Sequence, residues 1–277
     1  MARPVGLRTG RWPCCARFCS SNGTGSDPGL EEALSDRVSF RRFCGLALEE
    51  PTPDETTLCR FRLALVAAGL GDALFAEVSR QLDAAGFMVK AGTLVDASLV
   101  EAAVRRPADG SSPKGQESRS PHDPDANWTR AGRGRTLFFG YKVHVGVDQG
   151  SGIIRSRAVT PAKVYESEVA DDLLMGDERS FYADKAYEKQ ARREALKARG
   201  IKDRIQHRRV RGQPVLPRWQ TVRNTLIGRV RTAVERTFSE LKRGPYGFVR
   251  MRYRGLPRCC LHFDLTIIAY NLRRAAG

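Results

Sequence analysis

The fold is decided by residues 137–148, which read LFFGYKVHVGVD. From Tyr141 to Asp148 the odd-numbered positions are apolar and the even-numbered positions are polar or glycine. Because successive side chains of a strand point to opposite faces, this period of two predicts a β-strand with two unlike faces. Residues 148–152, DQGSG, predict a turn, and residues 153–159 predict the returning strand of a hairpin.

Outward from the hairpin, strand and helix patterns alternate. Short apolar runs predict three further strands, at 93–96, 181–184 and 201–205. Helical patterns occupy 166–174, 188–199 and 226–242, the last with an apolar stripe that predicts packing on a sheet. A polar stretch over 107–135 predicts a long surface loop. This order predicts a mixed α/β domain over residues 91–277.

The region before this domain has a different pattern. Residues 27–90 have apolar residues at helical spacing, broken by a Pro-containing turn at 49–54, which predicts a small helical domain. The pattern is equally compatible with a helix-turn-helix-like DNA-binding unit and with an ordinary helical bundle. Residues 1–26 contain four arginines, no acid and no convincing amphipathic period, so we expect a disordered or aberrant N-terminus there.

The charge is concentrated in the last third of the chain. The 277 residues have a formal net charge of +16, and residues 185–277 hold 24 of the 47 Lys and Arg but 6 of the 31 Asp and Glu. So strong a positive field is self-repulsive unless a polyanion neutralises it, which makes nucleic acid the first partner to consider. A solvated basic surface is the alternative.

Other classes of protein are disfavoured by composition. No apolar run approaches the roughly 18–20 residues that a membrane-spanning helix needs, so we expect no membrane association. The seven cysteines form no regular framework and lie at no zinc-finger spacing to the four histidines. We therefore expect reduced thiols and a cytoplasmic protein.

Three carboxylates stand where an acid has no structural need to be. Asp96 and Asp184 follow apolar runs at expected strand ends, and Glu235 lies among apolar positions of the expected helix 226–242. Such acids, brought together, repel one another unless divalent cations bind, and two such cations activate a nucleophile for phosphodiester cleavage. Each acid taken alone is more often a helix cap or a turn former.

Cations bracket Glu235 along its helix. Arg231 lies four residues before it and Lys242 seven residues after it, so both share its face. The arrangement fits a salt-bridge ladder, and it equally fits a metal ligand flanked by phosphate-binding cations.

The spacing Arg231-x3-Glu235-x6-Lys242 resembles part of the signature of bacterial insertion-sequence DDE transposases. Other stretches resemble the insertion-sequence-5 family in particular, in the family's order over roughly residues 27–275. They are residues 39–43 (SFRRF), 94–98 (LVDAS), 123–126 (DPDA), 140–144 (GYKVH), 182–185 (YADK) and 234–238 (VERTF).

This resemblance implies a ribonuclease-H-like catalytic domain in which Asp96, Asp184 and Glu235 form the DDE triad. The triad would hold two Mg²⁺ ions, with Mn²⁺ as a substitute. The implied activity is DNA cleavage at the ends of a mobile element and transfer of the 3′-hydroxyls to target DNA. The implied partners are double-stranded DNA, as terminal inverted repeats and as target, and further copies of the chain in an oligomer, in the cytoplasm at the nucleoid. The implied DNA-binding residues are Arg231, Lys242, Arg236, Lys185 and Lys142.

The chain departs from the family pattern at three places. Gly228 stands where a Tyr is usual, Ala186 where a Gly is common, and Tyr165-Glu166 where His-Asp is more usual. These departures leave an alternative open, a decayed transposase that only binds DNA. A basic RNA-binding protein is a third interpretation, and it predicts no grouping of the three acids.

Overall fold

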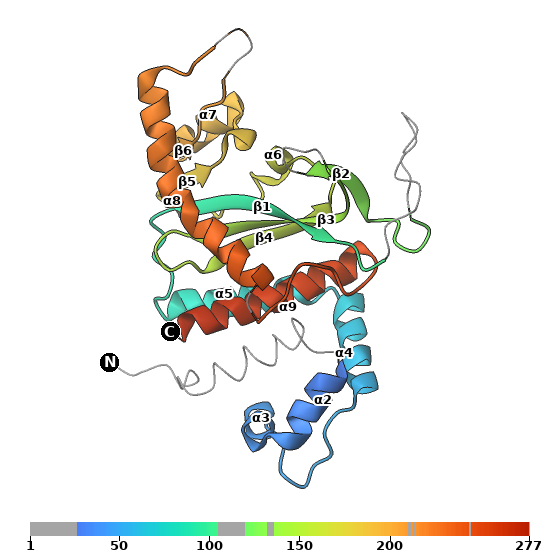
Figure 1. Cartoon of the computed structure of the whole chain (residues 1–277). Coiled ribbons are helices and arrows are strands. Elements are labelled where there is room, and N and C mark those ends of the chain that lie inside the picture. Colours follow the sequence, from blue (N-terminus) through green and yellow to red (C-terminus); the bar gives the residue numbers. More distant parts are fainter. Residues whose placement is uncertain are drawn as a thin grey trace, which may run out of the picture. The chain divides into compact units, whose positions relative to one another are not determined.

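The computed structural model describes residues 27–104, 120–131, 136–209, 212, 214–243 and 245–276 (Figure 1). By internal contacts the chain forms two compact units. The sheet unit comprises the described parts of residues 86–239 and 249–256, and the helical unit those of 1–85, 240–248 and 257–277. The expected N-terminal segment 1–26 lies outside the described residues, and the expected boundary near residue 90 stays a prediction.

The sheet unit is built on six strands. They are β1 (Thr93–Glu101), β2 (Asn127–Ala131), β3 (Thr136–Asp148), β4 (Ile154–Pro161), β5 (Ser180–Ala183) and β6 (Lys202–Ile205). Strands β4, β3 and β1 are antiparallel neighbours, and β5 and β6 follow β1 in parallel. An antiparallel meander extended by two parallel strands is the ribonuclease-H-like order, so the expected fold class is confirmed.

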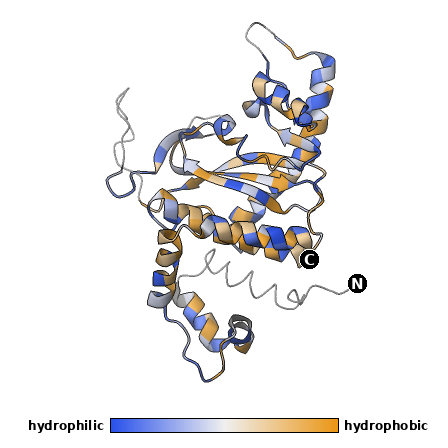
Figure 2. Ribbon diagram, turned by 180° about the vertical axis from the view of Figure 1, so that it is seen from behind, coloured by the Kyte–Doolittle hydropathy of each residue, from blue (hydrophilic) through white to orange (hydrophobic). Residues whose placement is uncertain are grey.

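Helices cover both faces of this sheet. On one face, Val95, Phe181 and Ala183 are fully buried against Tyr187 and against Leu196 of α7 (Gln190–Ala198). On the other face, Tyr182 and Arg204 lie against residues of α8 (Arg218–Arg243). The central strands are largely hydrophobic in Figure 2, as expected for a sheet buried on both sides.

Two expectations about the strands are wrong. The expected strand 93–96 continues to Glu101 because residues 97–101 keep pairing with β3, so Asp96 lies within β1 and not at its end. The expected loop 107–135 contains β2, which pairs with the start of β3. The strand expected over 137–148 is β3, and both of its faces are buried from Phe139 to Asp148.

The helices also differ in length from their predictions. The expected helix 166–174 is the single turn α6 (Glu166–Val169), followed by turns. Helix α8 starts at Arg218, well before the expected residue 226. Asp184 ends β5 and caps a short 3₁₀ turn, η1 (Lys185–Tyr187).

The helical unit contains the helices expected over residues 27–87. They are α2 (Asp27–Asp36), α3 (Val38–Cys44), α4 (Glu55–Ala67) and α5 (Gly71–Ala84). Leu30 and Leu34 of α2 pack against Leu58 of α4. Asp54 is the N-cap of α4, and its Oδ1 accepts from the Thr57 N–H at 2.6 Å.

The C-terminal helix α9 (Leu256–Ala275) has no counterpart among the predicted elements. It is buried along most of its length, and Phe248 packs on its His262 and Phe263 with ring centroids 5.1 and 5.2 Å away. No helix in the described part of the chain is long and apolar enough to cross a membrane.

Candidate active site

The register of β1 and β5 places two of the predicted acids side by side. The parallel pairing joins Thr93 to Phe181 and Leu94 to Tyr182, and then ends. Two residues beyond Leu94 and Tyr182 stand Asp96 and Asp184. Because residues two apart along a strand share a face, both carboxylates start from the face that α8 covers.

Arg231 of α8 joins these two carboxylates. One guanidinium nitrogen lies 3.3 Å from Asp96 Oδ1 and another lies 3.9 Å from Asp184 Oδ2. The Arg231 side chain is 8% exposed, whereas those of Asp96 and Asp184 are 21% and 36% exposed. A nearly buried cation between two acids reduces their mutual repulsion.

Asp184 also has a structural role. Its Oδ1 accepts a hydrogen bond from the Ala186 N–H at 2.8 Å and so caps η1. The capping role that any acid at a strand end can have is therefore real here, and it leaves Oδ2 directed at Arg231. The cap holds the carboxylate in one orientation beside Asp96.

A fourth carboxylate, Glu166 at the start of α6, belongs to the same electrostatic group. Its Oε1 lies 3.8 Å from Lys142 Nζ, and Lys142 also donates to the Val164 carbonyl at 2.8 Å. Burial raises the pKa of Glu166, with Asp184 adding to the rise and Lys142 opposing it. The sequence pattern did not single out Glu166 as a site residue, because it stands at a position where the family usually has Asp.

These neighbours shift the pKa of Asp96. Burial raises the pKa of its carboxyl to about 6, Glu166 and Asp184 add to the rise, and Arg231 opposes it. Burial likewise raises the pKa of the Tyr187 hydroxyl, to which the Glu166 and Asp96 carboxylates contribute. Neighbouring acids that raise one another's pKa values repel one another when ionised, and a bound divalent cation removes this repulsion.

His144 is neutral and structural. Burial lowers its pKa to about 3, with a contribution from Lys142. Its Nε2 lies 3.0 Å from Thr160 Oγ1 on the neighbouring strand.

The other predicted site residues lie on exposed surface or in the helical unit. Glu235 is exposed on α8, one turn after Arg231, and forms no hydrogen bond or ion pair within the described residues. Arg236 and Lys185 are exposed, and burial lowers the pKa of Lys242, which belongs to the helical unit. Among the described residues, no three His, Cys, Asp or Glu side chains are grouped closely enough to form a metal site.

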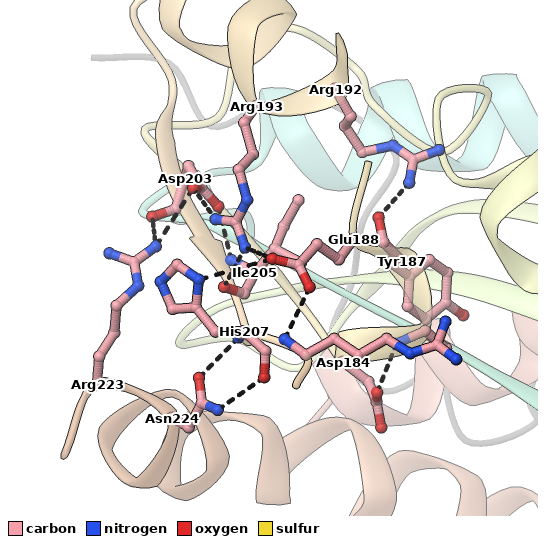
Figure 3. A network of polar contacts seen from close by, with 12 residues as sticks. Asp184, Tyr187, Glu188, Arg192, Arg193, Asp203, Ile205, His207, Arg223 and Asn224 are labelled. Carbon is pink, nitrogen blue, oxygen red and sulfur yellow. Dashed lines mark hydrogen bonds and ion pairs between the residues drawn. The ribbon is translucent and has the colours of Figure 1, made fainter. Parts of the chain in front are cut away.

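A polar network fixes the first half of α8 to the sheet (Figure 3). Asn224 accepts from the His207 N–H at 2.8 Å and donates to the His207 carbonyl at 3.0 Å. Arg223 donates to the Asp203 carbonyl at 2.7 Å, and the Asp203 carboxylate pairs with Arg193 of α7. The helix that contains Arg231 and Glu235 is therefore anchored directly to the end of β6.

The donors present suit a hard divalent cation. Carboxylate oxygens are the ligands that Mg²⁺ prefers, and Asp96 and Asp184 present theirs on one side of the sheet. The chemistry that such a group can perform is phosphoryl transfer with a bound metal ion.

The family comparison agrees with this geometry. Residues 89–272 match the family described as Transposase DDE domain, and residues 18–63 match one described as Transposase domain (DUF772). A cryo-EM structure of the piggyBac transposase synaptic complex with hairpin DNA is distantly similar, at 10% identity and a TM-score of 0.44 over all of this chain and 68% of that one. Since the first match spans most of the chain and includes β1, β5 and α8, the chain belongs to the DDE transposase family and is a DNA transposase.

Proposed function

We propose that Asp96, Asp184 and Glu235 form the metal-binding triad of this transposase. The observation that carries the proposal is the shared register of Asp96 and Asp184 with Arg231 between them. Glu235 is proposed as the third member because it lies one turn beyond Arg231 on the helix that the network anchors. The spacing of Arg231, Glu235 and Lys242 and the anchoring of α8 to the sheet both support this assignment.

The three acids would hold two Mg²⁺ ions, with Mn²⁺ as a substitute, and these ions would activate the attacking oxygen and stabilise the leaving one. The chain's own residues position this chemistry. Asp184 is held by its cap on η1, Asp96 by the central strand, and Arg231 keeps the two carboxylates together. Lys142 holds Glu166 against the same group of acids.

The substrate proposed is double-stranded DNA at the element's terminal inverted repeats, followed by target DNA. Hydrolysis at an element end exposes a 3′-hydroxyl, which then attacks the phosphorus of a target phosphodiester and displaces its 3′-oxygen. Arg236 and Lys185 are exposed beside the acids in sequence and are proposed as phosphate contacts. Lys242 and the N-terminal helices are proposed as further DNA contacts, and Arg231 reaches DNA only if it leaves the carboxylates.

Transposition joins two ends, so we also propose that the protein acts as a homo-oligomer. Its place would be the cytoplasm, at the nucleoid, where its DNA substrate is found.

The test is cleavage of a plasmid that carries the element's own ends, in Mg²⁺. Asp96→Asn, Asp184→Asn and Glu235→Gln should each abolish nicking while DNA binding in a mobility-shift assay is retained. Glu194→Gln, an exposed acid on α7, is the matched control and should cut normally. Normal cutting by any of the three variants would remove that residue from the triad.

The alternative function is DNA binding without cleavage. It is favoured by Gly228 at the place of the family's usual Tyr. Wild-type protein that shifts the end DNA but never nicks it, in Mg²⁺ or in Mn²⁺, would establish this alternative.

A further inference from the structure

A groove of about 900 Å³ opens in the sheet unit, and none of the three acids of the proposed triad lines it. One wall is α8, which contributes Trp219, Val222, Leu226 and Val230 at helical spacing. The opposite wall is the sheet, which contributes Tyr182 of β5 and Arg204 of β6. The groove adjoins the site at both walls, because Tyr182 precedes Asp184 by two residues and Val230 precedes Arg231.

The apolar side chains of this groove are exposed to an unusual degree. Trp219, Val222 and Leu226 are 60%, 52% and 54% exposed, on a helix whose Ile227 is buried. Large exposed apolar surfaces of this kind mark binding sites on soluble domains.

Trp219 is held in place rather than loose. The His207 ring meets it edge-on, with centroids 5.1 Å apart and an interplanar angle of 77°. Two hydrogen bonds with Asn224 fix the His207 main chain in turn. The contact therefore favours one orientation of the Trp219 ring, while the residue stays more than half exposed.

The charged residues that line the groove are all arginines: Arg204, Arg218 and Arg223. Arg223 is paired with Asp203, whereas Arg204 and Arg218 form no ion pair within the described residues. A ligand that combines negative charge with a flat apolar face would therefore match both the arginines and the apolar side chains of the groove.

We infer that the groove binds unpaired DNA beside the cleavage site, with a nucleobase stacked on Trp219 and phosphates at Arg204 and Arg218. This inference rests on the proposed function, because it takes the transposase's DNA as the ligand. Base stacking on a fixed aromatic ring between arginines is how single strands are bound without sequence preference. Intact duplex hides its base faces inside the stack, so it offers phosphates to the arginines but nothing to Trp219.

A second copy of the chain fits the groove less well. It would bring the three arginines of one groove close to those of another, and like charges oppose such an interface. An acidic peptide would satisfy the charge, and it is separated from DNA by the experiment.

The experiment compares three fluorescently labelled probes at one salt concentration, with full-length protein. They are a thymidine oligonucleotide of about 12 nucleotides, which falls in the usual range of site sizes, an abasic strand of equal length, and a blunt duplex. Wild type should bind the thymidine strand more tightly than the abasic one. Trp219→Ala should weaken binding of the thymidine strand about 5- to 150-fold, the equivalent of about 1–3 kcal/mol per stacked base, and leave the abasic strand and the duplex within about twofold.

Two variants control for structure. Trp219→Phe keeps a stacking ring and should restore most of the binding, and Thr225→Ala, exposed on α8 outside the groove, should bind as wild type. Equal binding of thymidine and abasic strands by wild type would overturn the inference. So would equal losses of all three probes in Trp219→Ala, or a change of sedimentation coefficient in that variant with no change in strand binding, which would indicate an interface between copies.

The outcome is separable from that of the proposed triad. Asp184→Asn should bind the thymidine strand as wild type does, because the groove does not include that carboxylate. A wild type that never cuts DNA but shows Trp219-dependent strand binding would reject the catalytic proposal and keep the groove. A wild type that cuts DNA but binds the thymidine and abasic strands equally would reject the inference about the groove and keep the catalytic proposal.

Discussion

Replacing Arg231 with Met removes the cation that contacts both aspartates while keeping a side chain of similar length. At an effective dielectric constant of about 20, charges 3.3 and 3.9 Å apart attract by about 5 and 4 kcal/mol before desolvation is subtracted. Removing one partner of a buried ion pair typically lowers stability by about 3–5 kcal/mol. Because Asp96 and Asp184 keep 21% and 36% of their side-chain surface exposed, we expect a smaller loss of about 2–4 kcal/mol.

The measurement is thermal unfolding at pH 7.5 in EDTA, followed by circular dichroism. For a chain of this size the expected loss lowers Tm by roughly 5–15 °C. Arg236→Met, an exposed neighbour on the same helix, is the matched control and should stay within about 0.5 kcal/mol of wild type. Adding Mg²⁺ should stabilise Arg231→Met more than wild type, because the metal replaces the missing cation between the carboxylates.

Lowering the pH should also narrow the difference in Tm between Arg231→Met and wild type. Arg231 lowers the pKa of Asp96, so its removal raises that pKa further. At pH 5 the Asp96 carboxyl is then protonated, which relieves the repulsion from Asp184 that remains at pH 7.5. If Arg231→Met and Arg236→Met have the same Tm, in EDTA and in Mg²⁺ alike, the view that Arg231 holds the two acids together is refuted.

Three further outcomes are expected. Nicking in Mg²⁺ should fall as the pH drops through about 6, because Asp96 must be ionised to bind metal and burial raises its pKa to about 6; a rate that is flat down to pH 5 would contradict this. Gly228→Ala should stabilise the protein by about 0.5–1 kcal/mol in urea unfolding, because a Cβ on this helical glycine meets only Gln206, at 3.5 Å. Gly140→Ala should destabilise it by about 1–3 kcal/mol, because its Cβ would lie 2.3 Å from the Val100 carbonyl oxygen, and an unchanged Tm would show that β1 and β3 can separate freely.

The local patterns predicted most of the elements that form the sheet. The alternation over residues 137–148 and the turn at 148–152 correspond to β3 and its hairpin with β4. The local patterns failed where tertiary contacts decide how far an element extends. Asp96 interrupts an apolar run, yet β1 continues through it because β3 supplies pairing partners as far as Gly140.

Helix α9 shows a second limit of the sequence patterns. It is buried over most of its length, so its apolar residues do not form the one-sided stripe that marks a surface helix. A helix surrounded by protein has no polar face to give it a recognisable period.

The sequence singled out Asp96 and Asp184 but not the way in which they are arranged. Asp96 and Asp184 were selected as acids after apolar runs, and the pairing of β1 with β5 brings them together. Arg231 was expected to contact DNA, whereas here it lies between the aspartates, because its position on a helix does not reveal which strand residues it faces. Glu166 was noted only as a departure from the family pattern, because only the fold places the first turn of α6 near Lys142.

The strand register has a consequence for inactive copies of this protein. Positions 96 and 184 are set by main-chain pairing of β1 and β5, and not by the acids themselves. A gene copy that encodes Asn at either position would keep the pairing of these strands and the basic surfaces of the protein. On the proposed function, such a protein would occupy the same DNA ends and enter the same oligomers without cutting, so an element that accumulates defective copies would restrain its own movement.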